Sequence, residues 1–459
     1  MHPRPILSAC RRSVVALLPL LALLALPASA GADAPKVVQT SPANGDLAVD
    51  PSITELRVVF DQPMDRRAGH SFVGGGETFP EIVGQPRWLD EKTIVLPIRL
   101  AAGRGYQLSI NSEQFQGFRN AAGEPAEPYP LAFTTADDKP LSPELNAAAI
   151  QQVRDALRDR YSYRDVHRAD WDALFTAADA ELKSAASRAA FGQRLARLLA
   201  EAGDVHISVG VGPQRFWTHQ PKFAPNFNGR LIPQVVPNFK KHSESLYSGR
   251  FDDRVGYIMI ASLEAARGAD AAAITDVLGG MADARALILD LRPNGGGDER
   301  IAQPVAGLFI EKPVIYAQRQ TIDPARPDGF SEPVKTMLNP TPLGVGPRLR
   351  QPVAVLMGPN NMSSAEGFLL MMRQVPQAKL IGGRSYGSSG NPQPIELANG
   401  VTVYLPSWKA MDAAGVVFEG KGIEPDIEVA ATPEQLQSRD PVLERGLAWL
   451  RANGSEGRP

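Results

Sequence analysis

The sequence predicts a multidomain chain with an N-terminal all-β sandwich, a small helical domain and a C-terminal α/β core. The first observation behind this prediction is the length of 459 residues with 43% apolar content, which allows about three domains of roughly 150 residues. The second is a change of hydrophobic pattern along the chain, from short strands over 35–137 to helical spacing over 144–205. The third is an alternation of strand and helix patterns from about residue 255 onward.

The first 30 residues read as a cleavable export signal. Arg4, Arg11 and Arg12 form a positive region, the run SVVALLPLLALLALP follows, and the small residues ASA end at Ala30. A membrane anchor is the alternative, but the run is shorter than the ~20 residues that a spanning helix needs. No other run reaches spanning length, and the only cysteine, Cys10, lies inside this segment. We therefore expect an exported mature chain with no membrane span, disulfide or thiolate site.

Residues 35–137 are expected to form the β-sandwich. Short apolar or alternating runs are separated by turn residues, as in TELRVVF, TIVLPIRL, YQLSI and LAFTTA. The stretch SPANGDLAVDPSITELRVVFDQPMD resembles the opening of bacterial immunoglobulin-like domains of exported proteins. Asp61 and Asp65 could bind a metal, but the simpler interpretation is that they are turn residues at a strand end.

The stretch DDKPLSP at 137–143 is interpreted as a linker, and two helices are expected after it. Residues 145–161 and 187–203 carry apolar side chains at spacings of three and four, and Gly203 is placed to end the second helix. Residues 212–252 show no clear period and are expected to form a loop region that is mobile or faces substrate.

Strands and helices then alternate. The strand candidates are apolar throughout, which predicts a sheet covered on both faces. Strands are expected at 255–262, 285–291, 352–357, 378–382 and 401–406, and helices at 270–282 and 364–375.

Three consecutive glycines, at 295–297, follow the second of these strands in LILDLRPNGGGDE. Glycine permits close backbone approach and positive φ, so successive N–H groups can converge on one anion. The run lacks both GxGxxG and the GK[ST] ending, so nucleotide binding has little support. A plain tight turn remains the alternative.

Ser363 begins the expected helix at the end of a buried-type strand, in MGPNNMSSAEGF. The pattern SSAE alone would be a capping box, in which the hydroxyl serves the helix N-terminus. The same position favours a developing negative charge and suits a nucleophile, but a serine needs a base. His206, in AGDVHISVGVG, and Glu419, in FEGKGIEPDIEV, are the candidates for base and orienting carboxylate, although each alone could be merely structural.

Taken together, these segments carry a resemblance. In chain order GDVHISV, GYIMI, LILDLRPNGGG, NNMSSAE, IGGRSYGSSG and EGKGIEPDIEV are similar to the C-terminal-processing or tail-specific serine protease family, including its tricorn-core and retinoid-binding-protein-like relatives. The resemblance covers residues 144–445. It implies a helical part over 144–205 and a crotonase-like α/β core over 206–445.

The resemblance also implies roles for individual residues. Ser363 matches the nucleophile, and Gly295, Gly296 and the Ser364 amide match the oxyanion hole. Glu366 matches a structural position on the first turn of the helix.

Two departures from the family are visible. Where bacterial members carry a lysine base, this chain has Ser388, so the tricorn-like arrangement of His206 and Glu419 is expected instead. The serine that precedes the tricorn histidine is replaced by Val205. A lysine recruited from elsewhere, such as Lys379 or Lys421, is the alternative base. The chain also has no room for an ordinary PDZ insert between His206 and VGYIMI, so selection of peptide tails by that module is not expected.

The predicted function is hydrolysis of peptide bonds in an exported compartment, with a polypeptide as substrate and with no cofactor or metal. A formal net charge of −2 without long charged runs disfavours a nucleic-acid or anionic-membrane partner. The main rival is a non-catalytic protein that binds apolar ligands or peptides on the same scaffold. An acyl-CoA enzyme of the crotonase kind is a third reading, which the ordered protease set disfavours.

Overall fold

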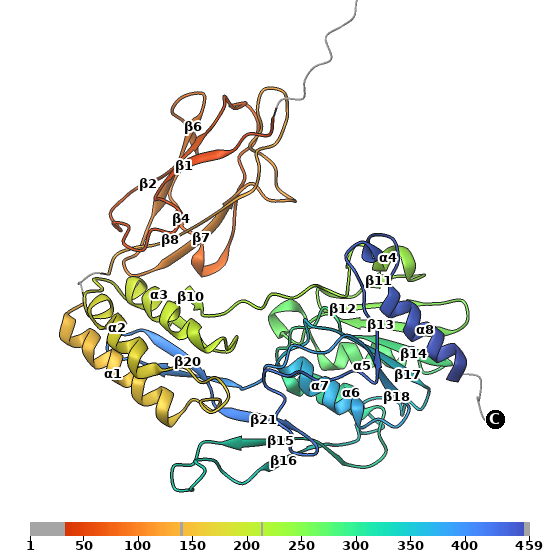
Figure 1. Cartoon of the computed structure of the whole chain (residues 1–459). Coiled ribbons are helices and arrows are strands. Elements are labelled where there is room, and N and C mark those ends of the chain that lie inside the picture. Colours follow the sequence, from red (N-terminus) through yellow and green to blue (C-terminus); the bar gives the residue numbers. More distant parts are fainter. Residues whose placement is uncertain (1–32, 138–140, 213, 454–459) are drawn as a thin grey trace, which may run out of the picture.

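A computed structural model describes residues 33–137, 141–212 and 214–453 (Figure 1). The predicted export signal and Cys10 lie outside the described residues, as does part of the predicted linker. None of the described helices combines the length and the apolar character that crossing a bilayer requires.

The N-terminal domain consists of two small antiparallel sheets, drawn in red and orange in Figure 1. One contains β1 (Val37–Ser41), β2 (Glu55–Phe60), β4 (Glu81–Ile82), β5 (Arg87–Trp88) and β6 (Thr93–Arg99), and the other β3 (Phe72–Val73), β7 (Gly105–Ile110) and β8 (Tyr129–Thr134). Alternate side chains of β2, β6, β7 and β8 fill the core between them, as the period of two predicts. Asp61 and Asp65 accept backbone N–H groups of Lys36 and Arg67, which fits the turn interpretation.

The helical module consists of three helices on one small sheet. Helices α1 (Pro143–Asp159), α2 (Trp171–Lys183) and α3 (Arg188–Leu199) begin after Ser142, Asp170 and Ser187, whose side chains each accept a backbone N–H of the first turn. The sheet has the order β10-β9-β20-β19, with β9 (Ser208–Val211), β10 (Gln214–Trp217), β19 (Pro392–Glu396) and β20 (Thr402–Pro406). The strand expected at 401–406 therefore pairs with β9 and does not join the large parallel sheet.

The α/β core is built on a seven-stranded sheet of order β11-β12-β13-β14-β17-β18-β22. Its strands are β11 (Lys240–Lys241), β12 (Leu246–Arg250), β13 (Val255–Ile260), β14 (Ala286–Asp290), β17 (Val353–Met357), β18 (Ala378–Gly382) and β22 (Ile427–Glu428). The five from β13 to β22 run parallel. Residues 212–252, expected as a loop region, thus contribute two strands to this sheet, besides β10 and α4 (Ile232–Val235).

Helices cover both faces of the parallel sheet, which explains why its strands are apolar throughout. Leu287 and Leu289 pack with α5 (Ala271–Gly279), α6 (Glu299–Gly307) and α7 (Ser364–Arg373), whereas Ile288 packs with α8 (Pro441–Asn453) on the other face. A separate three-stranded sheet lies beside α7 and consists of β15 (Val314–Thr321), β16 (Val334–Leu338) and β21 (Trp408–Asp412).

The N-terminal domain contacts the helical module through a few polar bonds. The Arg188 guanidinium and backbone N–H donate to the carboxylate of Asp137 at 2.6–2.8 Å, and Thr134 donates to Gln214 at 2.5 Å. Figure 1 shows this domain beside α3 and away from the α/β core.

Candidate active site

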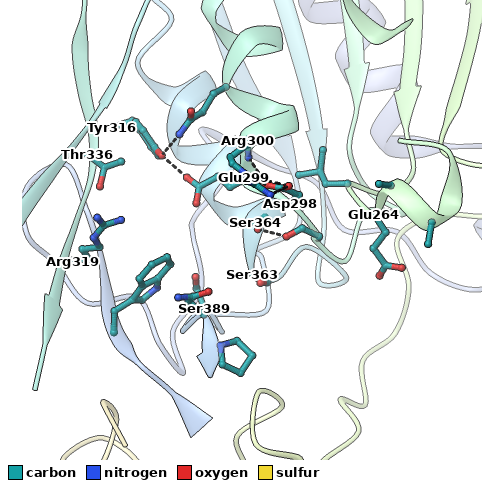
Figure 2. A pocket seen from close by; sticks show the side chains of 18 residues that line it. Glu264, Asp298, Glu299, Arg300, Tyr316, Arg319, Thr336, Ser363, Ser364 and Ser389 are labelled. Carbon is teal, nitrogen blue, oxygen red and sulfur yellow. Dashed lines mark hydrogen bonds and ion pairs between the residues drawn. The ribbon is translucent and has the colours of Figure 1, made fainter. Parts of the chain in front are cut away.

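Ser363 occupies a strained turn between β17 and α7. Its backbone has φ 55° and ψ −131°, a region that non-glycine residues rarely adopt and that costs about 1–3 kcal/mol. Its side chain makes no capping bond to the helix, so the capping-box interpretation does not hold here. The turn instead directs the hydroxyl toward a cleft (Figure 2).

Buried bonds hold this turn in place. The Ser363 N–H donates to the Ser388 carbonyl at 2.6 Å. The buried amide of Asn361 donates to the carbonyls of Leu291 and Asn294 at 2.5 and 3.0 Å, and so joins the serine turn to the glycine loop. Sequence reasoning did not single out Asn361, because an asparagine in a turn has many simpler explanations.

The glycine loop lies against the serine turn. A Cβ at Gly296, where φ is 111°, would lie 3.0 Å from the Ser363 Cβ and 3.2 Å from the Ser364 nitrogen. The Gly296 N–H, however, already donates to Asn294 Oδ1 at 2.9 Å. It therefore has a protein acceptor in this structure, which argues against the expected role of Gly296 in an oxyanion hole.

Gly297 offers the amide that Gly296 does not. The Gly296 carbonyl accepts the Leu263 N–H at 2.9 Å, so the N–H of the same trans peptide points away from Leu263. That is the side of Ser364, whose hydroxyl donates to the Gly297 carbonyl at 2.7 Å. No acceptor among the described residues takes the amide of Gly297 or that of Ser364. Gly295 lies farther out, with its nearest neighbour, the Asn360 carbonyl, 3.9 Å from an added Cβ.

His206 is held in the turn before β9. Its backbone N–H donates to Asp204 Oδ1 at 2.8 Å, and its ring Nδ1 lies 2.8 Å from Ser388 Oγ. Burial lowers the pKa of His206, so the ring is a neutral imidazole near pH 7. Among the described residues no hydrogen bond joins Ser363 Oγ to this ring; both residues contact Ser388, one through its backbone and one through its imidazole.

Among the described residues, Ser388 joins Glu419 to the His206 ring. The Ser388 hydroxyl donates to Glu419 Oε1 at 3.1 Å, and the Ser389 N–H donates to Oε2 at 3.0 Å. The direct contact between Glu419 and His206 expected from the sequence is thus replaced by a chain of three residues, Glu419, Ser388 and His206, here called the Ser388 bridge. Burial raises the pKa of Glu419 to about 7.

The serine turn and the glycine loop lie on one cleft of about 710 Å³. Its walls combine polar and charged side chains with apolar ones such as Leu263 and Trp408, and Figure 2 shows Ser363, Ser364 and Ser389 on one side and Tyr316 and Arg319 on the other. Residues 254–429, which contain the glycine loop, the serine turn and Glu419, match the family described as Peptidase family S41. The chain contains a peptidase family S41 domain.

Other comparisons agree with the S41 assignment. The N-terminal residues 31–135 match the family described as Bacterial Ig-like domain. The carboxy-terminal processing protease CtpA of Bacillus subtilis is 27% identical over 187 residues, which is 40% of this chain and 37% of that protein. A probable CtpA-like serine protease of Staphylococcus haemolyticus is 27% identical over 151 residues, 33% of this chain and 28% of that protein. The matches thus span little more than a third of these relatives at most.

A solved structure shares the fold. A putative peptidase from Parabacteroides merdae superposes with a TM-score of 0.59 at 24% identity, covering 70% of this chain and all of that one.

Both histidines near the site, His167 and His206, lie N-terminal to the segment that matches the S41 family.

The S41 domain holds a second buried carboxylate, Glu366, on the first turn of α7. Its oxygens accept the Ser385 hydroxyl at 2.5 Å and the N–H groups of Gly387 and Ser388 at 2.8 and 2.9 Å. Burial raises the pKa of Glu366 to about 8. The three donors fix the loop that carries Ser388, which agrees with a structural role.

The lysines considered as alternative bases lie elsewhere. Lys379 and Lys421 are exposed and do not line the cleft. The buried Lys409 is paired with Asp165 at 2.7 Å and lies 3.6 Å from the Phe330 ring centroid. Burial and pairing thus give this third lysine a structural role.

His167 and Asp204 lie close to Glu419, and the sequence analysis assigned a role to neither. His167 Nε2 lies 3.3 Å from Glu419 Oε1 and 4.0 Å from Asp204 Oδ2. The three side chains offer atoms within 4.8 Å of one another, a spacing that could hold a metal ion. Each carboxylate already accepts protein donors, Asp204 from Tyr161 at 2.9 Å and from His206, and Glu419 from Ser388 and Ser389. We therefore interpret the group as a hydrogen-bond network.

Proposed function

We propose that this protein is an exported serine-type peptidase that hydrolyses peptide bonds with Ser363 as nucleophile and His206 as general base. The observation that carries the proposal is the strained Ser363 turn, packed against the glycine loop and joined through Ser388 to His206 and Glu419. The matched S41 segment and the named serine proteases among its relatives support the same chemistry. The proposal of export rests on the pattern of residues 1–30.

The Ser388 bridge assigns the protons. The Ser388 hydroxyl has a single hydrogen, which it uses in the hydrogen bond that it donates to Glu419. Its oxygen therefore accepts a hydrogen bond from His206 Nδ1, so the ring proton is on Nδ1. Nε2 then carries a free lone pair, as a base requires. When Ser363 Oγ attacks the scissile carbonyl, its proton passes to Nε2, and the carbonyl oxygen becomes an oxyanion.

The oxyanion is stabilised by the amides of Gly297 and Ser364. Both are free of acceptors among the described residues, and the Ser364 amide lies at the positive end of α7. A single donor of this kind contributes about 3–4 kcal/mol in comparable sites. Collapse of the intermediate breaks the C–N bond, and the Nε2 proton goes to the departing amine. Water then attacks the acyl-serine and gives a proton to His206 Nε2. The C–Oγ bond breaks, His206 returns the proton to Ser363 Oγ, and the new carboxyl end is released.

The test is labelling with a fluorophosphonate, followed by identification of the modified residue. We expect labelling at Ser363, its loss in Ser363→Ala and His206→Ala, and its retention in Ser364→Ala. Hydrolysis of an unfolded protein substrate should be lost in the same two variants. A protein that binds peptides or apolar ligands without cutting them would remain unlabelled at every pH.

A further inference from the structure

His167 contacts Glu419 at Oε1, the same oxygen that accepts the Ser388 hydroxyl. It belongs to the segment between α1 and α2, so it comes from a different part of the chain than Glu419. Its ring stacks on Tyr161 at 6.5 Å between centroids and meets Tyr163 edge-on at 6.2 Å. The side chain is 16% exposed, so the ring is fixed by packing with one side open to solvent.

Ring nitrogen Nε2 of His167 faces two carboxylates. It lies 3.3 Å from Glu419 Oε1 and 4.0 Å from Asp204 Oδ2. Nearby negative charges of this kind favour the imidazolium form of a histidine. Burial opposes this charge, but the bond to Glu419 and the negative charges of Asp204 and Glu419 raise the pKa of His167 above its ordinary value.

Glu419 depends on that cation because its other neighbours are neutral or negative. The carboxylate of Asp204 raises the pKa of Glu419, and Glu366, whose own pKa burial raises to about 8, supplies no positive charge. The phenols of Tyr161, Tyr163 and Tyr386 are uncharged at neutral pH. The remaining titratable neighbour, His206, stays neutral through burial.

The charge of Glu419 determines where the protons of the Ser388 bridge lie. With Glu419 ionised, Ser388 donates to it and accepts from His206 Nδ1, which leaves Nε2 free to act as a base. A protonated Glu419 can instead donate to Ser388, whose own proton then turns toward Nδ1. The single ring proton of neutral His206 must then move to Nε2, and the nitrogen required by Ser363 is blocked.

We propose that His167 is a positioning residue that keeps Glu419 ionised and thereby selects, through Ser388, the His206 tautomer that accepts the proton of Ser363. This inference rests on the proposed function. On this basis activity should fall at low pH because neutral His206 changes its tautomer, and not because its ring becomes protonated.

The first test is the pH dependence of fluorophosphonate labelling at Ser363 in the full chain, from pH 5 to 10. In His167→Gln the ionised form of Glu419 loses its cation, so its pKa rises, and the labelling rate should fall off at a pH higher by about one unit or more. Above that limb Glu419 is ionised in both proteins, so the plateau rates should agree within about threefold. His242→Gln is the matched control, because His242 also has a serine partner, Ser248 at 2.7 Å, but lies outside the cleft.

The inference is overturned if the labelling rate of His167→Gln falls off at the same pH as that of the wild type. It is also overturned if the rate of this variant is lowered equally at every pH, which would show a role in folding alone. A wild-type protein that is never labelled overturns the proposed function as well.

The second test needs no substitution. Nitrogen NMR of histidine-labelled wild-type protein at pH 8 should show His167 protonated at both ring nitrogens and His206 protonated at Nδ1 only. Lowering the pH through the limb should move the His206 proton to Nε2. A neutral His167, or a His206 that carries its proton on Nε2 at the pH of full labelling, would overturn the inference even if the variant failed to fold.

Discussion

Gly297→Ala tests the geometry of the glycine loop most directly. Gly297 has φ 133°, and a Cβ there would lie 2.3 Å from the Leu263 carbonyl carbon and 2.4 Å from its oxygen. The overlap is with backbone, so no side chain can rotate away. Relief requires the loop to separate from Leu263, with loss of the bonds Leu263 N–H to Gly296 and Asp298 N–H to Leu263.

The expected cost follows from these contacts. A non-glycine residue held at such a φ costs about 1–3 kcal/mol. Two lost backbone hydrogen bonds add about 0.5–1.5 kcal/mol each, so the free energy of unfolding should fall by about 2–6 kcal/mol. Because the loop moves away from Ser364, labelling of Ser363 should also be lost.

Gly295→Ala is the matched control within the same run of three glycines. Its Cβ would meet only the Asn360 carbonyl at 3.9 Å, and its φ is not in the positive region. The free energy of unfolding of this variant should differ from that of the wild type by no more than about 1 kcal/mol. Replacing glycine by alanine restricts the unfolded chain, and this alone stabilises a protein by about 0.4–1 kcal/mol.

Urea unfolding followed by tryptophan fluorescence measures the difference. At a slope of about 3 kcal/mol per molar, the midpoint of Gly297→Ala should fall by roughly 0.7–2 M and that of Gly295→Ala should hardly move. Equal midpoints for the two variants would refute the assignment of backbone overlap at Gly297, and with it the orientation of its amide.

Three further results are expected. Ser388→Ala breaks the Ser388 bridge and should slow labelling of Ser363 by about 10²–10⁴, by analogy with loss of the orienting group in a triad. The control Ser389→Ala keeps its backbone bond to Glu419 and should change the rate less than tenfold. Equal labelling rates in the two variants would remove the bridge from the mechanism. Arg292→Met leaves two buried aspartates without their cation and should lower the free energy of unfolding by about 3–5 kcal/mol in urea titrations, against less than about 1 kcal/mol for Arg300→Met on the surface. Removal of residues 1–137 should leave labelling and cleavage of small peptides intact, because that domain lines no part of the cleft; a folded but inactive product would show that it completes the site.

Most of the core strands and helices could be predicted from hydrophobic period alone. Apolar runs between turn signals gave β13, β14, β17 and β18, because a strand between two helical layers has apolar side chains on both faces. The period could not say which sheet a strand joins, so the pairing of β20 with β9 was not predicted. Helix α6, with Pro304 inside it, lacked the regular pattern and was missed.

The candidate site shows the same division. Ser363 and its strand–turn–helix setting were visible in the sequence, since local patterns determine both. The amide donor was not, because the direction of the Gly297 N–H depends on pairing with Leu263. His167 could not be found either: it meets Glu419 across 252 positions of sequence, and an isolated histidine carries no signal of its partner.

The pairing of β9 with β20 has a practical consequence for anyone who wishes to produce a smaller active protein. Trimming the gene to residues 254–429 would keep Ser363 but discard His167 and His206 and remove β9, the neighbour of β20. Apolar side chains such as Val403 and Leu405, now covered by the helical module, would face water and favour aggregation. The shortest useful product therefore begins before α1, near Asp137. The unit that folds intact is larger than the segment that matches the family.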